Sequence, residues 1–365
     1  MQTEQQNPLA TQKVSSLILK FTIPAIISMM VSSLYNIVDQ IFIGQGVGYL
    51  GNAATNVAFP LTTICLAITL LISIGSASRF SLSLGEGDAD RAAQAVGNAL
   101  AMMVLFGILY TLCIEIFLVP LLNAFGATQD VLPYAIEYTR ITAVGMPLLI
   151  ITNGMSNLAR ADGSPNYSMM CMLIGAIINT ILDPLFIFKF HMGVRGAAFA
   201  TVIGQFFSFL MALYYVKKFT HIRLKKQHFI LKPQVCLNIA SLGMSNCLNQ
   251  VAITFVQIVM NNSMTYYGAK TIYGSEIPLA ASGIVMKTNG ILLSVIIGLS
   301  QGSQPIIGFN YGAKQYDRVR GIYRLAISCN LVVSAIGFVL FQFFPKQIIA
   351  LFGTGDELYF TFAVR

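Results

Sequence analysis

The sequence predicts an all-α integral membrane protein built from two similar halves that cross the bilayer in the same direction. Hydrophobic residues make up 56% of the 365 residues and charged residues only 10%, whereas ordinary globular domains carry roughly 25% charged residues. The apolar residues are gathered in many long runs, and about 20 apolar residues are enough for a helix to cross a bilayer. Short motifs of the first half also recur in the second half.

Nine complete apolar runs are long enough to be transmembrane helices, and a tenth begins near Tyr359. The stretch before the first run is polar, and that run is too long for a cleaved signal peptide. We therefore expect the N-terminus to stay in the cytoplasm. The expected spans are Leu17–Ile43, Ala54–Leu84, Ala93–Val119, Pro133–Leu158, Tyr167–Phe188, Gly196–Val216, Val235–Tyr266, Pro278–Gly308 and Gly321–Phe343.

Basic residues gather in every second loop, which is the pattern of cytoplasmic loops in a multi-pass protein of the cell membrane. The loops expected outside hold only Lys189, Arg195, Lys270 and Lys346. The net charge of +8 therefore reflects topology, and we do not expect nucleic-acid binding. The loops expected in the cytoplasm hold Arg91, Arg160, Lys217, Lys218, Arg223, Lys225, Lys226, Lys232, Lys314, Arg318, Arg320 and Arg324.

The motifs of several enzyme and cofactor classes are absent from the sequence. There is no GxxxxGK[ST] phosphate loop, no HExxH and no GxSxG motif, so neither ATP hydrolysis nor these catalytic chemistries are indicated. The six cysteines show no CxxC spacing and are expected to be packing residues. We expect a protein that is not an enzyme and has no cofactor.

The two halves share short motifs at corresponding places. Gly75–Gly87 is answered by Ser300–Gly312, and Leu122–Ala127 by Ile349–Thr354. Both copies start on the expected cytoplasmic side, and parallel repeats of this kind are known among transporters, which bind their substrates between the repeats. The chain then divides into a first lobe of six transmembrane helices, a basic cytoplasmic linker that touches membrane lipid, and a second lobe of three helices and the start of a fourth: residues 1–218, 219–234 and 235–365.

Because the second repeat has fewer spans than the first, we expect a truncated or fragmentary copy that ends at Arg365 within an apolar helix. The site between the repeats would then be open on one side.

Two carboxylates, Asp39 and Asp183, lie deep inside expected spans, where ionisable residues are costly and are functional candidates. Asp183 follows Asn179 by four residues, so the two share a helix face. Both spans run outward, which places both carboxylates in the outer half of the first lobe, at the depth of Thr201. Asp39 ends a polar stripe on one face of the first span, formed by Ser28, Ser32, Tyr35 and Asn36.

Two carboxylates, an amide oxygen and a hydroxyl are hard oxygen ligands of the kind that suits Na⁺. Asp39, Asn179, Asp183 and Thr201 are the expected metal ligands if Na⁺ is used. Alternatively, burial lets a carboxylate carry a proton, and either ion would suit coupled transport. A structural alternative remains, in which each aspartate only hydrogen-bonds a neighbouring helix.

A second polar stripe, without charge, follows the seventh span at Asn246, Gln250, Thr254, Gln257 and Asn261. It could line a cavity or hydrogen-bond neighbouring helices. Two methionines lie on or beside the polar faces of the first and fifth spans, and their flexible thioethers suit varied ligands. We expect the substrate to contact Met29, Ser32, Met172, Asn246, Gln250 and Gln257.

Together these motifs resemble those of the multidrug and toxic compound extrusion (MATE) family, and the resemblance covers essentially the whole chain. It implies twelve helices in two six-helix lobes around a V-shaped cavity. It also implies the export of bulky, often cationic drugs or dyes in exchange for Na⁺ or H⁺. The segments that carry it are Ile23-Pro24, Asp39-Gln40, Gly75–Arg91, Gln301–Gly312, Asn179-x-x-x-Asp183-Pro184 and Gly196–Thr201.

Within that family the sequence is similar to the DNA-damage-inducible-protein-F group, which has an acidic cation site in the first lobe. This resemblance implies a drug:cation antiporter, which we expect to act as a monomer. Two alternatives stay open: a flippase for a lipid-linked glycan, with which the scarcity of deep cations disagrees, and an inactive truncated fragment. The cation site implied by the resemblance comprises Asp39, Tyr138, Asn153, Asn179, Asp183 and Thr201.

Overall fold

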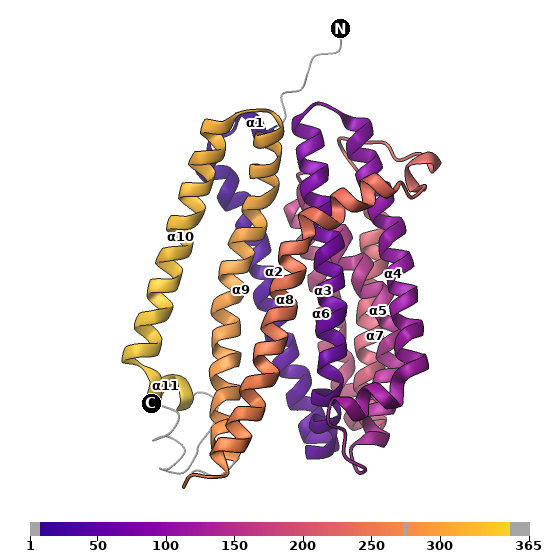
Figure 1. The fold of residues 1–365 in the computed structure, drawn as a ribbon, viewed down its shortest axis with the longest axis vertical. Helices are drawn as coiled ribbons and strands as arrows, with labels where there is room; N and C mark the ends of the chain where they lie inside the picture. Colours follow the sequence, from indigo (N-terminus) through magenta and orange to yellow (C-terminus); the bar gives the residue numbers. More distant parts are fainter. Residues whose placement is uncertain (1–7, 273–275, 351–365) are drawn as a thin grey trace.

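The computed structural model describes residues 8–272 and 276–350, which form a bundle of long helices running side by side (Figure 1). Over these residues, nine helices are long and apolar enough to cross a membrane. The elements, in chain order, are α1 (Pro8–Thr11), α2 (Val14–Val47), α3 (Tyr49–Gly85), α4 (Ala89–Ala124), α5 (Leu132–Ala161), α6 (Pro165–Pro184), the π-helical turn η1 (Leu185–Lys189), α7 (Gly193–Tyr215), the 3₁₀ turn η2 (Lys226–Phe229), α8 (Pro233–Gly268), α9 (Glu276–Gly312), α10 (Tyr316–Phe343) and α11 (Pro345–Ala350).

The prediction of nine apolar spans is confirmed, because each expected span overlaps one of the nine long helices. The helices reach further than the apolar runs: α3 begins at Tyr49 rather than near Ala54. Adding a residue to an existing helix is easy compared with starting one, so polar flanking residues continue it. The expected start of a tenth span near Tyr359 lies outside the described residues.

The outer surface of the bundle is apolar over much of its length. Leu109 and Ile116 of α4, Phe255 of α8 and Phe338 of α10 are each more than half exposed. Large apolar surfaces of this kind mark an interaction or membrane site in a native protein. With nine spanning helices, lipid is the natural solvent for them, and the chain is a multi-pass membrane protein.

The tight turns between helices gather at the two ends of the bundle. Gly87, at φ +80°, closes the turn between α3 and α4, because only glycine adopts this conformation without steric cost. Asp88 then caps α4 by accepting a hydrogen bond from the Arg91 backbone N–H at 2.9 Å. We call the end that carries this turn and α1 the α1 end, and the opposite end, near α11, the α11 end (Figure 1).

Helices α2–α7 form a first helix group, and α8–α10 form a second that packs mainly on α2 and α3. The largest apolar core lies in the first group, around the fully buried Phe80, Met103, Ile150 and Leu158. All six cysteines of the chain are free, which agrees with their expected packing role.

The backbones of α3 and α8 touch through two glycines. A Cβ atom on Gly75 would collide with the Ile239 carbonyl, and one on Gly243 would collide with the Leu71 carbonyl. Lipid chains are as apolar as the helix surfaces, so membrane helices associate through such close contacts between small residues. The two glycines therefore set how closely the helix groups meet.

Helix α9 meets the first group in the same way. A Cβ atom on Gly85 of α3 would collide with the Phe309 carbonyl, and one on Gly302 of α9 would collide with the backbone of Thr22 on α2. Gly85 ends α3 and Gly302 lies ten residues before the end of α9. These contacts therefore concentrate at the α1 end.

The two copies of the repeated motif, Gly75–Gly87 and Ser300–Gly312, face each other at these contacts. The Gln304 amide donates to the Ser78 hydroxyl at 2.6 Å and to the Ile74 carbonyl at 3.3 Å. Sequence comparison found the motif twice, and the structure shows that the copies contact one another.

We expect Gly243→Ala to destabilise the protein by about 1–3 kcal/mol, because the added methyl group overpacks the α3–α8 contact. Gly290→Ala is the matched control: nothing lies within 4 Å of its added Cβ, and the better helix propensity of alanine stabilises the fold by up to about 1 kcal/mol. Thermal unfolding of both purified variants in detergent measures the difference. Equal midpoints for the two variants would contradict this account of the contact.

Candidate cation site

Helices α2 and α6 pack along each other and bring two carboxyl groups together. Asp39 of α2 and Asp183 of α6 lie within hydrogen-bonding reach, and Asp183 is fully buried, with 0% of its surface exposed. Two carboxylates that share a buried site strongly resist ionising together. A proton or another cation between them removes that repulsion.

An amide and a hydroxyl complete this cluster. The Asn179 amide nitrogen donates to Asp183 Oδ1 at 3.2 Å and to the Thr201 hydroxyl of α7 at 3.3 Å. The structure therefore brings together Asp39, Asn179, Asp183 and Thr201, the four residues expected as ligands. Their function as ligands stays a prediction.

Three oxygen atoms in the cluster have no hydrogen-bond partner among the described residues. They are Asp39 Oδ1, Asn179 Oδ1 and Asp183 Oδ2, and each is buried. Leaving a buried acceptor unpaired costs about 1–3 kcal/mol. A cation bound by these oxygens would remove that cost, so the residues present fit Na⁺ or a proton.

The local backbone changes form directly after Asp183. Pro184 ends α6, and the chain continues as the π-helical turn η1. Proline has no N–H to give to the helix, and π-helical turns are frequent at functional sites. Asp183 therefore lies where the regular helix of α6 is interrupted.

Two tyrosines stand beside the carboxyl pair. Tyr138 of α5 and Tyr35 of α2 are both close enough to interact electrostatically with Asp39 and Asp183. Asn153, the remaining member implied by the family resemblance, donates its amide to the Leu149 carbonyl of its own helix at 2.9 Å. Tyr138 thus lies near the carboxyl pair, whereas Asn153 donates its hydrogen bond within its own helix.

The six residues expected to contact substrate lie on three helices. Helix α8 packs chiefly on α3, whereas α2 and α6 pack on each other, so the three residues on α8 and the three on α2 and α6 belong to different helix contacts. On α8, Gln250, Thr254 and Gln257 are half-buried while apolar neighbours such as Phe255 are exposed, so this polar face points into the protein. The side chain of Asn261 lies outside the described residues. The six are Met29, Ser32 and Met172 on α2 and α6, and Asn246, Gln250 and Gln257 on α8.

The prediction that Arg160 is a loop residue was wrong. Helix α5 continues to Ala161, and Arg160 is buried with only 3% of its surface exposed. Its guanidinium donates to the Gln301 side chain of α9 at 2.9 Å and to Ser168 at 3.2 Å. This residue links the helix groups at the α1 end through neutral partners only, as far as the described residues show.

Asp162, directly after α5, was also missed by the sequence analysis. Its buried carboxylate accepts hydrogen bonds from the Tyr215 hydroxyl and the Thr220 backbone N–H, both at 2.8 Å, and contacts His221 Nδ1 at 2.9 Å. It therefore fixes the chain that leaves α7. An aspartate in a polar loop gives no signal for this role in the sequence.

The hydrogen bond to Asp162 raises the pKa of His221. Because the pKa of His221 is higher in the folded state than in the unfolded state, protonation of His221 stabilises the fold. This stabilisation is complete below the unfolded-state pKa of about 6.5 and is lost as the pH rises through the folded-state pKa. We expect the unfolding midpoint of the wild type to fall over this window, and that of His221→Gln to fall less. Thermal unfolding over a pH series tests this, with His191→Gln as the control. Superimposable pH profiles for wild type and His221→Gln would exclude it.

A family model and individual relatives of known name point to the same family of membrane transporters. The MatE family pattern matches residues 24–185 and 245–363. The chain is 24% identical to the probable multidrug resistance protein YoeA of Bacillus subtilis, over 98% of this chain and 78% of that protein. It is 26% identical to the FAD transporter of Shewanella oneidensis, over 96% of this chain and 77% of that protein.

Solved structures show the same fold. An outward-facing multidrug resistance MATE family transporter of the MOP superfamily superposes with a TM-score of 0.90 at 22% identity, over 100% of this chain and 80% of that one. A MATE protein in complex with the ligand MaD3S gives a TM-score of 0.88 at 23% identity, over 98% and 78%.

Proposed function

Because the chain belongs to the MatE family, whose members are membrane transporters and not enzymes, we propose that it is an antiporter exporting bulky organic compounds in exchange for Na⁺ or H⁺. The names of its relatives, a probable multidrug resistance protein and an FAD transporter, support drugs or FAD as candidate substrates. The observation that carries the proposal is the pair of Asp39, which is half-buried, and Asp183, which is fully buried.

The carboxyl pair supports ion coupling because a single cation bound there would act on two neighbouring carboxyl groups at once. With a proton or Na⁺ bound, the repulsion between the two groups is relieved; without one, α2 and α6 are driven apart at this point. A ligand shifts a conformational equilibrium only through its different affinities for the two states. The cation and the exported compound would then favour opposite states.

Helix α2 offers a direct route from this pair to the second helix group. It carries Asp39 and, six residues earlier, Ser33, whose hydroxyl lies 2.6 Å from the hydroxyl of Ser294 on α9. A change in α2 at Asp39 therefore reaches α9 within about two helical turns. In this scheme Tyr138 and Asn153 of α5 complete the cation site, as the family resemblance implies.

We assign the lobes as residues 1–218 and 235–365, joined by the basic linker 219–234, with the α1 end toward the cytoplasm of the cell. The distribution of Lys and Arg supports this orientation. The exported compound would contact Met29, Ser32, Met172, Asn246, Gln250 and Gln257 in a V-shaped cavity between the lobes of one monomer.

We expect Asp39→Asn and Asp183→Asn each to reduce ion-driven export to the background of protein-free liposomes, because an amide cannot supply the negative charge that binds the cation. The measurement is ethidium transport, and separately FAD transport, by the chain reconstituted in liposomes. One series uses a pH gradient without Na⁺, and the other uses a Na⁺ gradient at uniform pH. The gradient that drives wild-type transport identifies the coupling ion.

The matched control is Asp130→Asn, which makes the same chemical change at an exposed residue between α4 and α5. It should transport like the wild type, and equal reconstitution of all variants is checked by gel. Wild-type rates in Asp183→Asn under both gradients would refute the role of the carboxyl pair.

A further inference from the structure

A polar pocket of about 330 Å³ lies at the α1 end, where helices of both groups converge. Its walls come from α3, α4 and the first two turns of α8. Five of its six lining side chains are polar, and two are arginines. They are Arg79, Arg91, Gln94, Gln234, Val235 and Asn238.

The pocket is built directly on the backbone contact between α3 and α8. Arg79 follows Gly75 by one helical turn on α3, and Asn238 precedes Ile239, whose carbonyl faces Gly75. A ligand held by Arg79 and Asn238 would therefore bridge the first and second helix groups.

In a bilayer centred on α3, Arg79 would lie in the headgroup layer. Helix α3 has 37 residues and is therefore about 55 Å long, which exceeds the hydrocarbon core of about 30 Å by about 12 Å at each end. Arg79 lies six residues before the end of α3, or about 9 Å along the axis. In this placement Arg79 would lie near the depth of the lipid phosphates.

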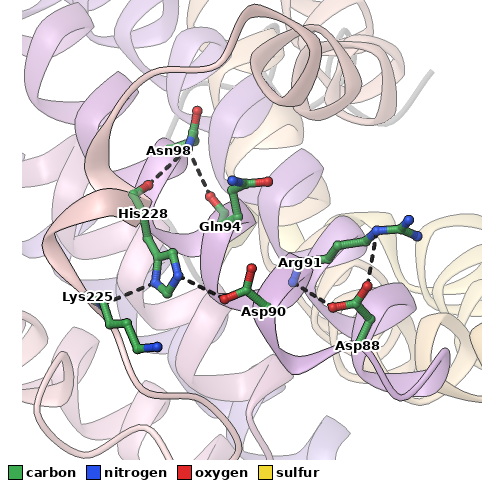
Figure 2. Close-up of polar contacts among 7 residues, drawn as sticks. All are labelled: Asp88, Asp90, Arg91, Gln94, Asn98, Lys225 and His228. Carbon is green, nitrogen blue, oxygen red and sulfur yellow. Dashed lines mark hydrogen bonds and ion pairs between the residues drawn. The ribbon is translucent and has the colours of Figure 1, made fainter.

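The two arginines give the pocket positive charge, and among the described residues only one of them forms ion pairs with nearby carboxylates. Arg79 makes no ion pair with any carboxylate in the described part of the chain, whereas Arg91 lies 3.1 Å from Asp88 and 3.8 Å from Glu86. The remaining nearby acid, Asp90, turns toward His228 at 3.2 Å, away from the Arg91 guanidinium (Figure 2). The pocket therefore offers one unpaired guanidinium, with a second whose charge is shared.

Amide groups complete a set of donors suited to phosphate. Gln94, Gln234 and Asn238 each bring an NH₂ group, and Gln94 stands one turn along α4 from Arg91 (Figure 2). Guanidinium and amide donors around one space match the oxygens of a phosphate group. Arg91 and Gln234 lie in the first turns of α4 and α8, which adds the positive ends of two helix dipoles.

We propose that this pocket binds a phosphate group, carried by an anionic lipid headgroup or by a soluble phosphate ester, and that the bound phosphate stabilises the contact between the helix groups at the α1 end. The binding is separate from the cation site and does not depend on the transported compound.

The test is the thermal unfolding midpoint of the full chain in neutral detergent. It is measured against increasing dioleoyl phosphatidylglycerol, dioleoyl phosphatidylcholine or inorganic phosphate. We expect phosphatidylglycerol to raise the midpoint of the wild type more than phosphatidylcholine does. Arg79→Gln should need about tenfold more phosphatidylglycerol for the same shift, the cost of losing one charged hydrogen-bond donor.

Two further variants sharpen the result. Arg320→Gln changes an arginine on the exposed surface of α10, with 74% of its side chain exposed, and should respond like the wild type. Asn238→Asp places a negative charge in the pocket at an exposed residue; it should weaken the response as Arg79→Gln does, and it carries the test if Arg79→Gln does not fold.

The outcomes separate clearly. If inorganic phosphate reproduces the shift and Arg79→Gln reduces it, the site is supported and its ligand is a soluble phosphate ester. If only phosphatidylglycerol acts, the ligand is the lipid headgroup. The proposal is overturned if neither anion shifts the wild type, or if Arg79→Gln and Asn238→Asp both respond like Arg320→Gln.

Discussion

Close backbone contact at the α1 end is the constraint on which the rest of this fold depends. A lipid bilayer gives apolar helices no hydrophobic reason to associate, so they hold together where backbones approach and polar groups bond across the contact. Here Gly75 and Gly243 join α3 to α8, and Gly85 and Gly302 join α9 to α3 and α2. Replacing any of these glycines by alanine would add a methyl group at the contact and push the helix groups apart. The same contact supplies the walls of the arginine-lined pocket.

The carboxyl pair lies away from this contact, inside the first helix group, yet one helix connects them. Helix α2 meets Gly302 of α9 through Thr22, bonds Ser294 through Ser33, and presents Asp39 to Asp183 on α6. Cation binding at the pair and packing between the groups therefore act on the same helix. This arrangement gives a physical basis for coupling, because a helix transmits a displacement along its length better than a loop does.

The sequence alone predicted the spans and the carboxyl pair for the same reason: hydrocarbon penalises polar groups, so long apolar runs and rare internal charges both stand out. The four-residue spacing of Asn179 and Asp183 even placed them on one face. The burial of Arg160 could not be predicted, since it depends on Gln301, 141 residues away in the chain. The pocket was missed because its residues come from three helices whose register is set by glycine contacts.

The most direct test of the central claim, that Asp39 and Asp183 share one positive charge, is the infrared carbonyl band of protonated carboxylic acids in the reconstituted protein. Without Na⁺ at neutral pH, the account predicts one such band in the wild type. This band should be absent from the spectra of Asp39→Asn and Asp183→Asn, which gain only the amide bands of the new asparagine. If Na⁺ is the coupling ion, adding it abolishes the wild-type band; if H⁺ is, the band persists until the pH is raised. A wild-type spectrum with no protonated carboxyl from this pair and no response to Na⁺ would contradict the account.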